Sequence, residues 1–178
     1  MRVRIIAGKF GGRVIGSPGT YKTHPMSERA RGAIFNMLSK EIVGAKVLDG
    51  FAGTGALGLE ALSRGASSAT FVERDMKALR ILKENVELLG AENETRVIGG
   101  GLGSWLAGQD EKYDVVFSDP PYGEPQWGLV QKLADVLDED GLLLASFMKG
   151  ADVATLFGVR LEDERTYADA SVRFYRKI

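Results

Sequence analysis

The chain has 178 residues, of which 44% are hydrophobic, and its formal net charge is −1 at pH 7. This length and composition suit one compact fold with a complete core. The sequence has no cysteine and one histidine, His24, so disulfides and cysteine-based zinc sites are excluded and a histidine-rich metal site is disfavoured. No signal-peptide pattern and no membrane-length apolar run is present. We therefore expect a cytoplasmic protein without bound metal, of a size that suits a monomer.

Charge is unevenly distributed along the chain. Residues 1–31 carry seven Lys or Arg residues against one acid, Glu28, which gives +6, so the remaining residues must sum to −7. This asymmetry is compatible with a polyanionic partner and, at about even odds, with a solvated basic surface.

Residues 1–40 predict a small basic appendage made of a β-hairpin and a helix. Two short β-prone runs, 3–7 and 13–17, flank a glycine-rich turn, which predicts the hairpin. Ser27 then predicts a helix N-cap, and apolar residues recur at helical spacing through Leu38.

Strands alternate with helices in residues 41–178, which we predict to be the main domain. Predicted strands cover 47–48, 69–73, 95–98, 113–118 and 141–147, and predicted helices run to Leu62 and cover 76–89, 102–106 and 127–137. Apolar strands in this alternation indicate a parallel sheet covered on both faces. Residues 159–165 and 171–176 predict an antiparallel hairpin that closes the sheet. The predicted fold is α/β with a mostly parallel, seven-stranded sheet.

A glycine motif, Gly53-x-Gly55-x-x-Gly58, follows the first strand of this sheet. A helix follows the motif, and Glu73 ends the next strand about twenty residues later, as in nucleoside-binding loops. Glycine lets the backbone turn tightly and lets a ligand approach closely. Glu73 can accept hydrogen bonds from two ribose hydroxyls, so we predict a nucleoside cofactor here.

Two acids indicate which nucleoside is bound. A dinucleotide would place its pyrophosphate at the helix N-terminus, where the potential favours anions. Asp49 precedes the glycine loop, and Asp119 is expected at the same edge of the sheet. Two carboxylates disfavour a pyrophosphate and suit the cationic sulfonium and ammonium of S-adenosylmethionine. A nicotinamide oxidoreductase is therefore a disfavoured alternative.

The tetrapeptide Asp119-Pro120-Pro121-Tyr122 ends the fourth parallel strand. Its chemistry suits an exocyclic amine on a planar base. Asp119 and the Pro120 carbonyl can accept the two N–H groups, the prolines restrict the turn, and Tyr122 can stack on the base. A proline-rich turn with a surface tyrosine is the alternative interpretation.

Nearly the whole sequence resembles the bacterial small-subunit ribosomal RNA guanine-N2 methyltransferases of the RsmD type. The matching stretches are "RIIAGKFGGR", "HPMSERARGAIFNML", "VLDGFAGTGALGLEALSRGA", "FVERD" and "DVVFSDPPY". The resemblance implies a Rossmann-like class I methyltransferase that transfers a methyl group from S-adenosylmethionine to N2 of one guanine in 16S RNA. The substrate would be naked RNA or an assembling 30S particle.

The resemblance also implies residue roles. The catalytic residues would be Asp119, Pro120, Pro121 and Tyr122. The cofactor-binding residues would be Asp49, Phe51, Ala52, Gly53, Thr54, Gly55, Glu73 and Arg74. The residues that contact RNA would be Arg2, Arg4, Lys9, Arg13, His24 and Arg29.

The chain departs from the family pattern in places, and two rival functions stay open. His24 stands where an arginine is common, and Gly99–Gly101 replaces a polar residue near the adenine, so we expect backbone groups and apolar packing to hold that ring. One rival is a DNA adenine-N6 methyltransferase, which shares the tetrapeptide. The other is an RNA-binding assembly factor without turnover.

Overall fold

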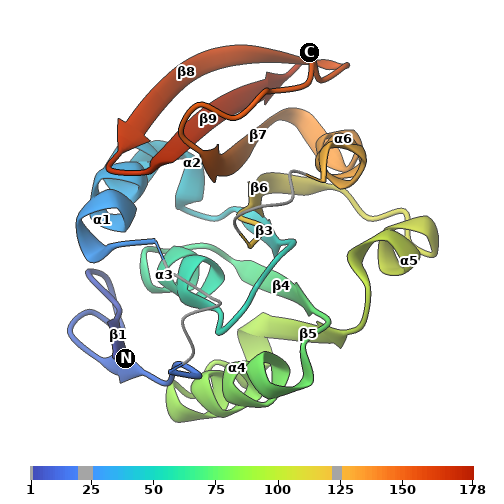
Figure 1. Ribbon diagram of the computed structural model, residues 1–178. Coiled ribbons are helices and arrows are strands. Elements are labelled where there is room, and N and C mark those ends of the chain that lie inside the picture. The colour runs from blue at the N-terminus through green and yellow to red at the C-terminus, as the bar shows by residue number, and fades with distance from the viewer. Residues whose placement is uncertain (1, 20–25, 122–125) are drawn as a thin grey trace.

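The structure is a computed structural model that describes residues 2–19, 26–121 and 126–178 (Figure 1). A two-stranded antiparallel sheet opens the chain, formed by β1 (Val3–Arg4) and β2 (Val14–Ile15). The helices are α1 (Glu28–Met37), α2 (Ser39–Ile42), α3 (Ala56–Ser63), α4 (Met76–Leu88), α5 (Leu102–Ala107) and α6 (Trp127–Asp135), with a 3₁₀ turn at Glu92–Glu94.

The main sheet has seven strands in the order β5-β4-β3-β6-β7-β9-β8. Their bounds are β3 (Lys46–Asp49), β4 (Ser68–Glu73), β5 (Thr95–Gly99), β6 (Tyr113–Ser118), β7 (Leu137–Met148), β8 (Val159–Tyr167) and β9 (Ala170–Lys177). The first five in this order are parallel, and β9 pairs antiparallel with both β7 and β8. The predicted α/β fold and its closing hairpin are confirmed.

The strand order reverses direction between β3 and β6. After β3 the chain builds β4 and β5 on one side, and it then crosses to build β6 and β7 on the other. In open α/β sheets, ligands bind beyond the carboxyl ends of the strands at such a switch point. The two motifs singled out from the sequence follow β3 and β6, so this topology brings both to one place.

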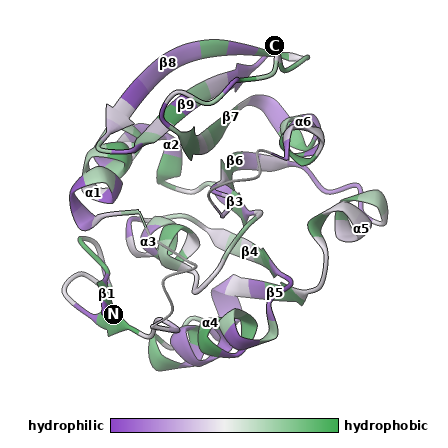
Figure 2. Cartoon of the chain, viewed as in Figure 1, coloured by the Kyte–Doolittle hydropathy of each residue, from purple (hydrophilic) through white to green (hydrophobic). Residues whose placement is uncertain are grey.

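Two hydrophobic cores cover the faces of the sheet. One core packs the four helices α1, α2, α3 and α4 against β3 and β6, through side chains such as Phe35, Leu59 and Phe117. The other packs α5 and α6 against the opposite face, around Leu133 and Leu143. Figure 1 shows this division of the helices, and Figure 2 shows that the edge strand β8 is mostly hydrophilic.

The N-terminal segment shares the first of these cores. Ile5, Ile15 and Ile34 are almost fully buried in the same cluster as the strands of the main sheet. Ser27 caps α1 as expected, since its hydroxyl accepts the Ala30 N–H at 3.1 Å. The division into domains at residue 40 stays a prediction.

The predicted end of the last helix was wrong. The helix expected at 127–137 ends at Asp135, because buried Leu137 pairs with Tyr113 and begins β7. A register shift follows, and Asp140 adopts a left-handed φ of 57° before the apolar part of the strand. No helix in the described ranges is long and apolar enough to cross a membrane.

Candidate active site

The glycine loop joins β3 to α3 at the switch point. Gly53 and Gly55 have φ values of +55° and +90°, a region that favours glycine. A side chain at Gly55 would also collide with Leu82, whose Cδ1 would lie 2.5 Å from the added Cβ. Position 55 therefore requires glycine both because of its positive φ and because of its close contact with Leu82.

Glu73 links this loop to the end of β4. One carboxylate oxygen accepts the Gly53 N–H at 2.6 Å, and the other accepts the Asp75 N–H at 2.8 Å. Each oxygen keeps a further acceptor position. Glu73 thus fixes the loop and can still receive hydroxyl groups from a ligand.

Asp49 is buried beneath the loop, with 1% of its surface exposed. Its Oδ2 accepts the N–H of Gly58 in the first turn of α3 at 3.1 Å, while Oδ1 has no hydrogen-bond partner among the described residues. Burial raises its pKa to about 7, the Gly58 bond opposes this, and the charges of Asp119 and Glu73 add to it. A buried carboxylate oxygen without a partner fits a cationic ligand.

Asp119 directly follows the last residue of β6 and is partly exposed. Burial of the carboxyl group raises its pKa to about 6, and the hydroxyl of Ser146 on β7 lowers it. Pro120 is partly exposed and Pro121 is exposed. Tyr122, the fourth residue of the predicted catalytic turn, lies outside the described residues.

Ser146 lies beside Asp119 and was not singled out from the sequence. β6 and β7 pair in register up to Ser118 and Ala145, so the next residues, Asp119 and Ser146, are neighbours. The Ser146 side chain is 4% exposed, and its hydroxyl lies near enough to the Asp119 carboxyl to favour its ionised form, although it does not meet the geometry of a hydrogen bond with any described residue. A lone serine in the apolar run of β7 was the available signal, but its significance depends on the register.

The other predicted cofactor residues lie in the glycine loop itself or directly after β4. Phe51 packs against the core on the α5–α6 side, and Ala52 is buried. Arg74 is exposed beside Glu73. The carbonyl of Thr54 accepts a hydrogen bond from Asn85 at 2.9 Å.

Gly100 and Gly101, which follow β5, leave open space beside this edge. The Gly100 N–H donates to the Glu73 carbonyl at 3.0 Å, which ties the segment to the end of β4. A Cβ at Gly101 would meet nothing within 4 Å, whereas one at Gly99 would lie 2.8 Å from Leu79. The expectation that backbone groups hold an adenine here stays a prediction.

The predicted RNA contacts among the described residues are exposed, but several are already paired. Arg4 forms an ion pair with Glu28 at 2.9 Å, and Lys9 forms one with Glu94 at 2.6 Å. Arg13 donates to the Leu88 carbonyl at 2.8 Å. Arg2 and Arg29 are also exposed, and His24 lies outside the described residues.

Arg31 shows that part of the basic charge is internal. Its side chain is 2% exposed and lies 3.7 Å from fully buried Glu60, while its guanidinium donates to the Arg4 carbonyl at 2.9 Å. Glu60 also accepts the Ile6 N–H at 2.9 Å. This charge fixes the N-terminal segment and is not available to a polyanion.

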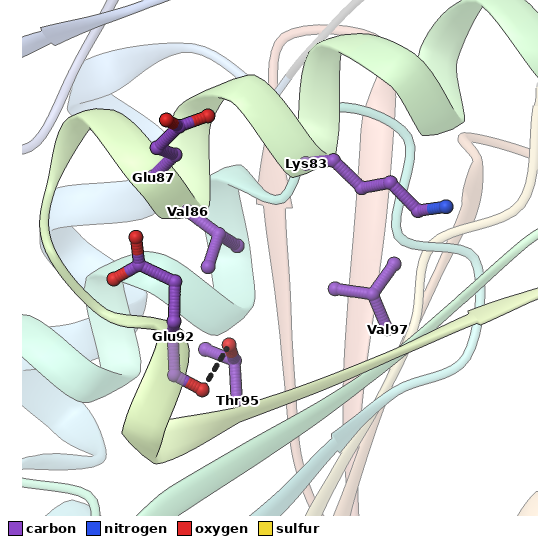
Figure 3. A pocket seen from close by; sticks show the side chains of 6 residues that line it. All are labelled: Lys83, Val86, Glu87, Glu92, Thr95 and Val97. Atoms are coloured by element: carbon purple, nitrogen blue, oxygen red, sulfur yellow. Dashed lines mark hydrogen bonds between the residues drawn. The ribbon is translucent and has the colours of Figure 1, made fainter.

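A hollow of about 300 Å³ lies elsewhere, between α4 and β5 (Figure 3). It is lined by Lys83, Val86, Glu87, Glu92, Thr95 and Val97. These residues belong to the last turns of α4, the 3₁₀ turn and the first half of β5, at the end of the sheet opposite the carboxyl edge. In the described ranges, no cluster of three or more His, Cys, Asp or Glu side chains suits a metal ion.

Comparison with known proteins places this geometry in a family. The family described as "Conserved hypothetical protein 95" matches residues 3–176. The "Ribosomal RNA small subunit methyltransferase D" of Escherichia coli (strain K12) is 39% identical over 142 residues, which cover 80% of this chain and 70% of the relative. The protein of the same name from Haemophilus influenzae is 33% identical, over 98% of this chain and 93% of its own.

A solved structure shows the same likeness. The "Putative methyltransferase yhhF" of Escherichia coli superposes with a TM-score of 0.88 at 32% identity, and the match covers 99% of this chain and 98% of that one. The Rossmann-like methyltransferase fold expected from the sequence is therefore confirmed. The chain belongs to the family described as conserved hypothetical protein 95, and its predicted resemblance to the RsmD-type methyltransferases is confirmed.

Proposed function

We propose that this protein transfers a methyl group from S-adenosylmethionine to the exocyclic N2 of a guanine in 16S ribosomal RNA. The observation that carries the proposal is the meeting of Asp119, Asp49 and the glycine loop at one edge of the sheet. The relatives named as small-subunit RNA methyltransferases support the RNA substrate. The choice of guanine N2 rests on the sequence resemblance.

The residues at the switch point fit S-adenosylmethionine. The free oxygen of buried Asp49 suits a positive charge on the cofactor, and Glu73 suits its ribose hydroxyls. Phe51, Ala52, Gly53, Thr54, Gly55 and Arg74 complete the proposed cofactor site. When bound, the cofactor supplies an electrophilic methyl group.

Asp119 and Pro120 would activate the amine. The lone pair of an exocyclic amine is delocalised into the base, so the nitrogen is a weak nucleophile. A carboxylate and a carbonyl that accept its N–H groups favour a localised lone pair. Asp119 would hold the proton that leaves the nitrogen as the N–C bond forms and the S–CH₃ bond breaks, with S-adenosylhomocysteine as the leaving group. The raised pKa of Asp119, about 6, brings this base closer to neutral pH. Pro121 and Tyr122 are proposed to fix the turn and stack on the base.

The exposed arginines and lysine of the N-terminal segment are proposed to contact the RNA backbone. Their ion pairs with Glu28 and Glu94 are exposed and would exchange with phosphate at modest cost. We propose that the protein acts as a cytoplasmic monomer on naked RNA or an assembling 30S particle.

Labelled S-adenosylmethionine tests this function on matched substrates. Small subunits from a strain that lacks the enzyme, large subunits from the same strain and plasmid DNA are each incubated with the protein. Label is expected in the small subunits alone. Label in plasmid would support the DNA adenine-N6 alternative, and binding to particles without label would support a non-catalytic assembly factor.

Asp119→Asn is the matched control for chemistry. The amide keeps the size of the side chain but accepts the departing proton poorly. We expect turnover to fall by about a hundredfold or more while cofactor affinity stays within about threefold. Equal loss of both would place Asp119 in cofactor binding instead.

A further inference from the structure

Asn85 on α4 holds together two segments that lie far apart in the sequence. Its side-chain nitrogen donates to the Gly16 carbonyl at 3.0 Å and to the Thr54 carbonyl at 2.9 Å. Its side-chain oxygen accepts the Gly16 N–H at 2.7 Å. Gly16 follows the N-terminal hairpin, and Thr54 lies in the glycine loop, so one buried amide joins the two.

The chemistry of this contact is specific to an amide. Asn85 is 2% exposed, and both of its N–H groups and its oxygen are used. An aspartate could accept the Gly16 N–H but would face two carbonyls without a donor. An alanine would leave three backbone groups without this partner, and buried polar groups without a partner are costly.

The two contacted segments are constrained by their own geometry. A Cβ on Gly16 would lie 3.3 Å from both the Asn85 oxygen and Ile81, so the backbone packs closely on α4. Thr54 stands between Gly53 and Gly55, which both have positive φ. The direction of the Thr54 carbonyl therefore depends on the conformation of this turn. Glu73 fixes the loop through the Gly53 N–H, and Asn85 fixes it through Thr54.

We propose that Asn85 is a positioning residue that couples cofactor binding at the glycine loop to docking of the N-terminal segment at Gly16. The inference rests on the proposed cofactor site. A ligand that orders the loop holds the Thr54 carbonyl toward Asn85, and the same amide then holds Gly16. Coupling of this kind is reciprocal, so a polyanion that orders the basic N-terminal segment would tighten cofactor binding by the same factor.

A second anchor of the N-terminal segment supplies a matched control. At the end of α3, the Ser63 hydroxyl accepts the Phe10 N–H at 2.9 Å. Ser63 lies at the opposite end of α3 from Thr54, and among the described residues its side chain bonds to Phe10 and Ala7 of the hairpin, not to the glycine loop. Ser63→Ala should loosen residues 7–10 while Gly16 stays docked on Asn85, so the coupling itself and the glycine loop should be unaffected.

The test compares the wild-type protein with Asn85→Asp, Asn85→Ala and Ser63→Ala. Calorimetry measures the affinity for S-adenosylhomocysteine, and amide hydrogen exchange follows residues 3–16 with and without that ligand. In the wild type, the ligand should slow exchange at Gly16. In both Asn85 variants, affinity should fall on the order of five- to tenfold and this slowing should vanish. Ser63→Ala should bind as the wild type does and keep the slowing.

Results against the coupling can be distinguished from results against the cofactor site. Unchanged Gly16 exchange in the liganded wild type would overturn the coupling, and this result needs no variant to fold. Equal loss of affinity in Ser63→Ala and Asn85→Asp would also overturn it, because general destabilisation would then explain both. Failure of the wild type to bind the ligand would instead remove the proposed cofactor site.

Discussion

Asp49 and Asp119 lie at the ends of adjacent strands, and the negative charge of Asp119 reinforces the effect of burial on Asp49. Burial is the main cause that raises the pKa of Asp49 to about 7, and the Gly58 N–H limits the rise. Ionisation of both carboxyl groups is therefore unfavourable in the cofactor-free protein, and a bound cation would favour their ionised forms. This property distinguishes the site from a pyrophosphate-binding loop.

Cofactor affinity should depend on pH and on the cofactor's charge. A cationic ligand favours ionised Asp49 and Asp119, so binding below pH about 7 releases protons and strengthens as pH rises. From about pH 5.5 to about pH 7, affinity for S-adenosylmethionine should rise by roughly tenfold. S-Adenosylhomocysteine lacks the sulfonium charge and should show a smaller rise. Calorimetry in two buffers measures how the affinity for each ligand changes with pH. Equal changes for the two ligands would contradict the charge argument.

Removal of the Asp49 charge should stabilise the cofactor-free protein at higher pH. The ordinary pKa of this group is 3.8 and the folded value is about 7, so the folded state keeps a proton that the unfolded state has lost. Stability from this group therefore falls as pH rises through that window. In Asp49→Asn the amide oxygen can still accept the Gly58 N–H.

Urea unfolding checks this expectation. The stability advantage of Asp49→Asn over the wild type should grow by about 2 kcal/mol between about pH 5.5 and about pH 8. An advantage that stays constant over this range would show that Asp49 is already ionised in the cofactor-free protein at about pH 5.5.

Loss of the Ser146 hydroxyl should shift the pH dependence of turnover. The hydroxyl favours the ionised form of Asp119, so Ser146→Ala should raise the pKa of Asp119. At saturating cofactor, the acidic limb of kcat should move upward by about half a unit to one unit. Ser118→Ala is the control. The Ser118 hydroxyl is also buried without a described hydrogen-bond partner, but its side chain lies on the face of β6 opposite to that of Asp119. Equal shifts in both variants would remove the specific role of Ser146.

The approach of α3 to β4 should tolerate no side chain at Gly58. An added Cβ would lie 2.3 Å from the ring of Phe71, which is fully buried. Gly58→Ala should therefore cost about 1–3 kcal/mol of unfolding free energy. Gly128→Ala in α6 meets nothing within 4 Å and should stabilise the protein by about 0.5–1 kcal/mol. Urea unfolding measures both, and a neutral Gly58→Ala would show that Phe71 can move away.

The sequence predicted what depends on local patterns. Apolar runs separated by glycine and proline predicted the strands, and the capping preference of Ser27 predicted the start of α1. The position of the site followed from topology, because both motifs end strands that flank the crossover. The boundary at Leu137 was missed because its pairing with Tyr113 is a long-range contact.

Features that depend on register or on distant packing were beyond the sequence. Ser146 gains meaning only from its place beside Asp119, and Asn85 only from its contacts with Gly16 and Thr54. Arg31 was counted with the basic surface, although burial against Glu60 makes it internal. In each case the partner lies more than twenty residues away, where periodicity carries no information.

The modified atom is the most direct test of the central claim. Small subunits from a strain that lacks the enzyme are treated with the protein and isotopically labelled S-adenosylmethionine, and the RNA is digested to nucleosides for mass spectrometry. The account predicts label in N2-methylguanosine and no label with Asp119→Asn. Label in a methylated adenosine or cytidine would contradict it.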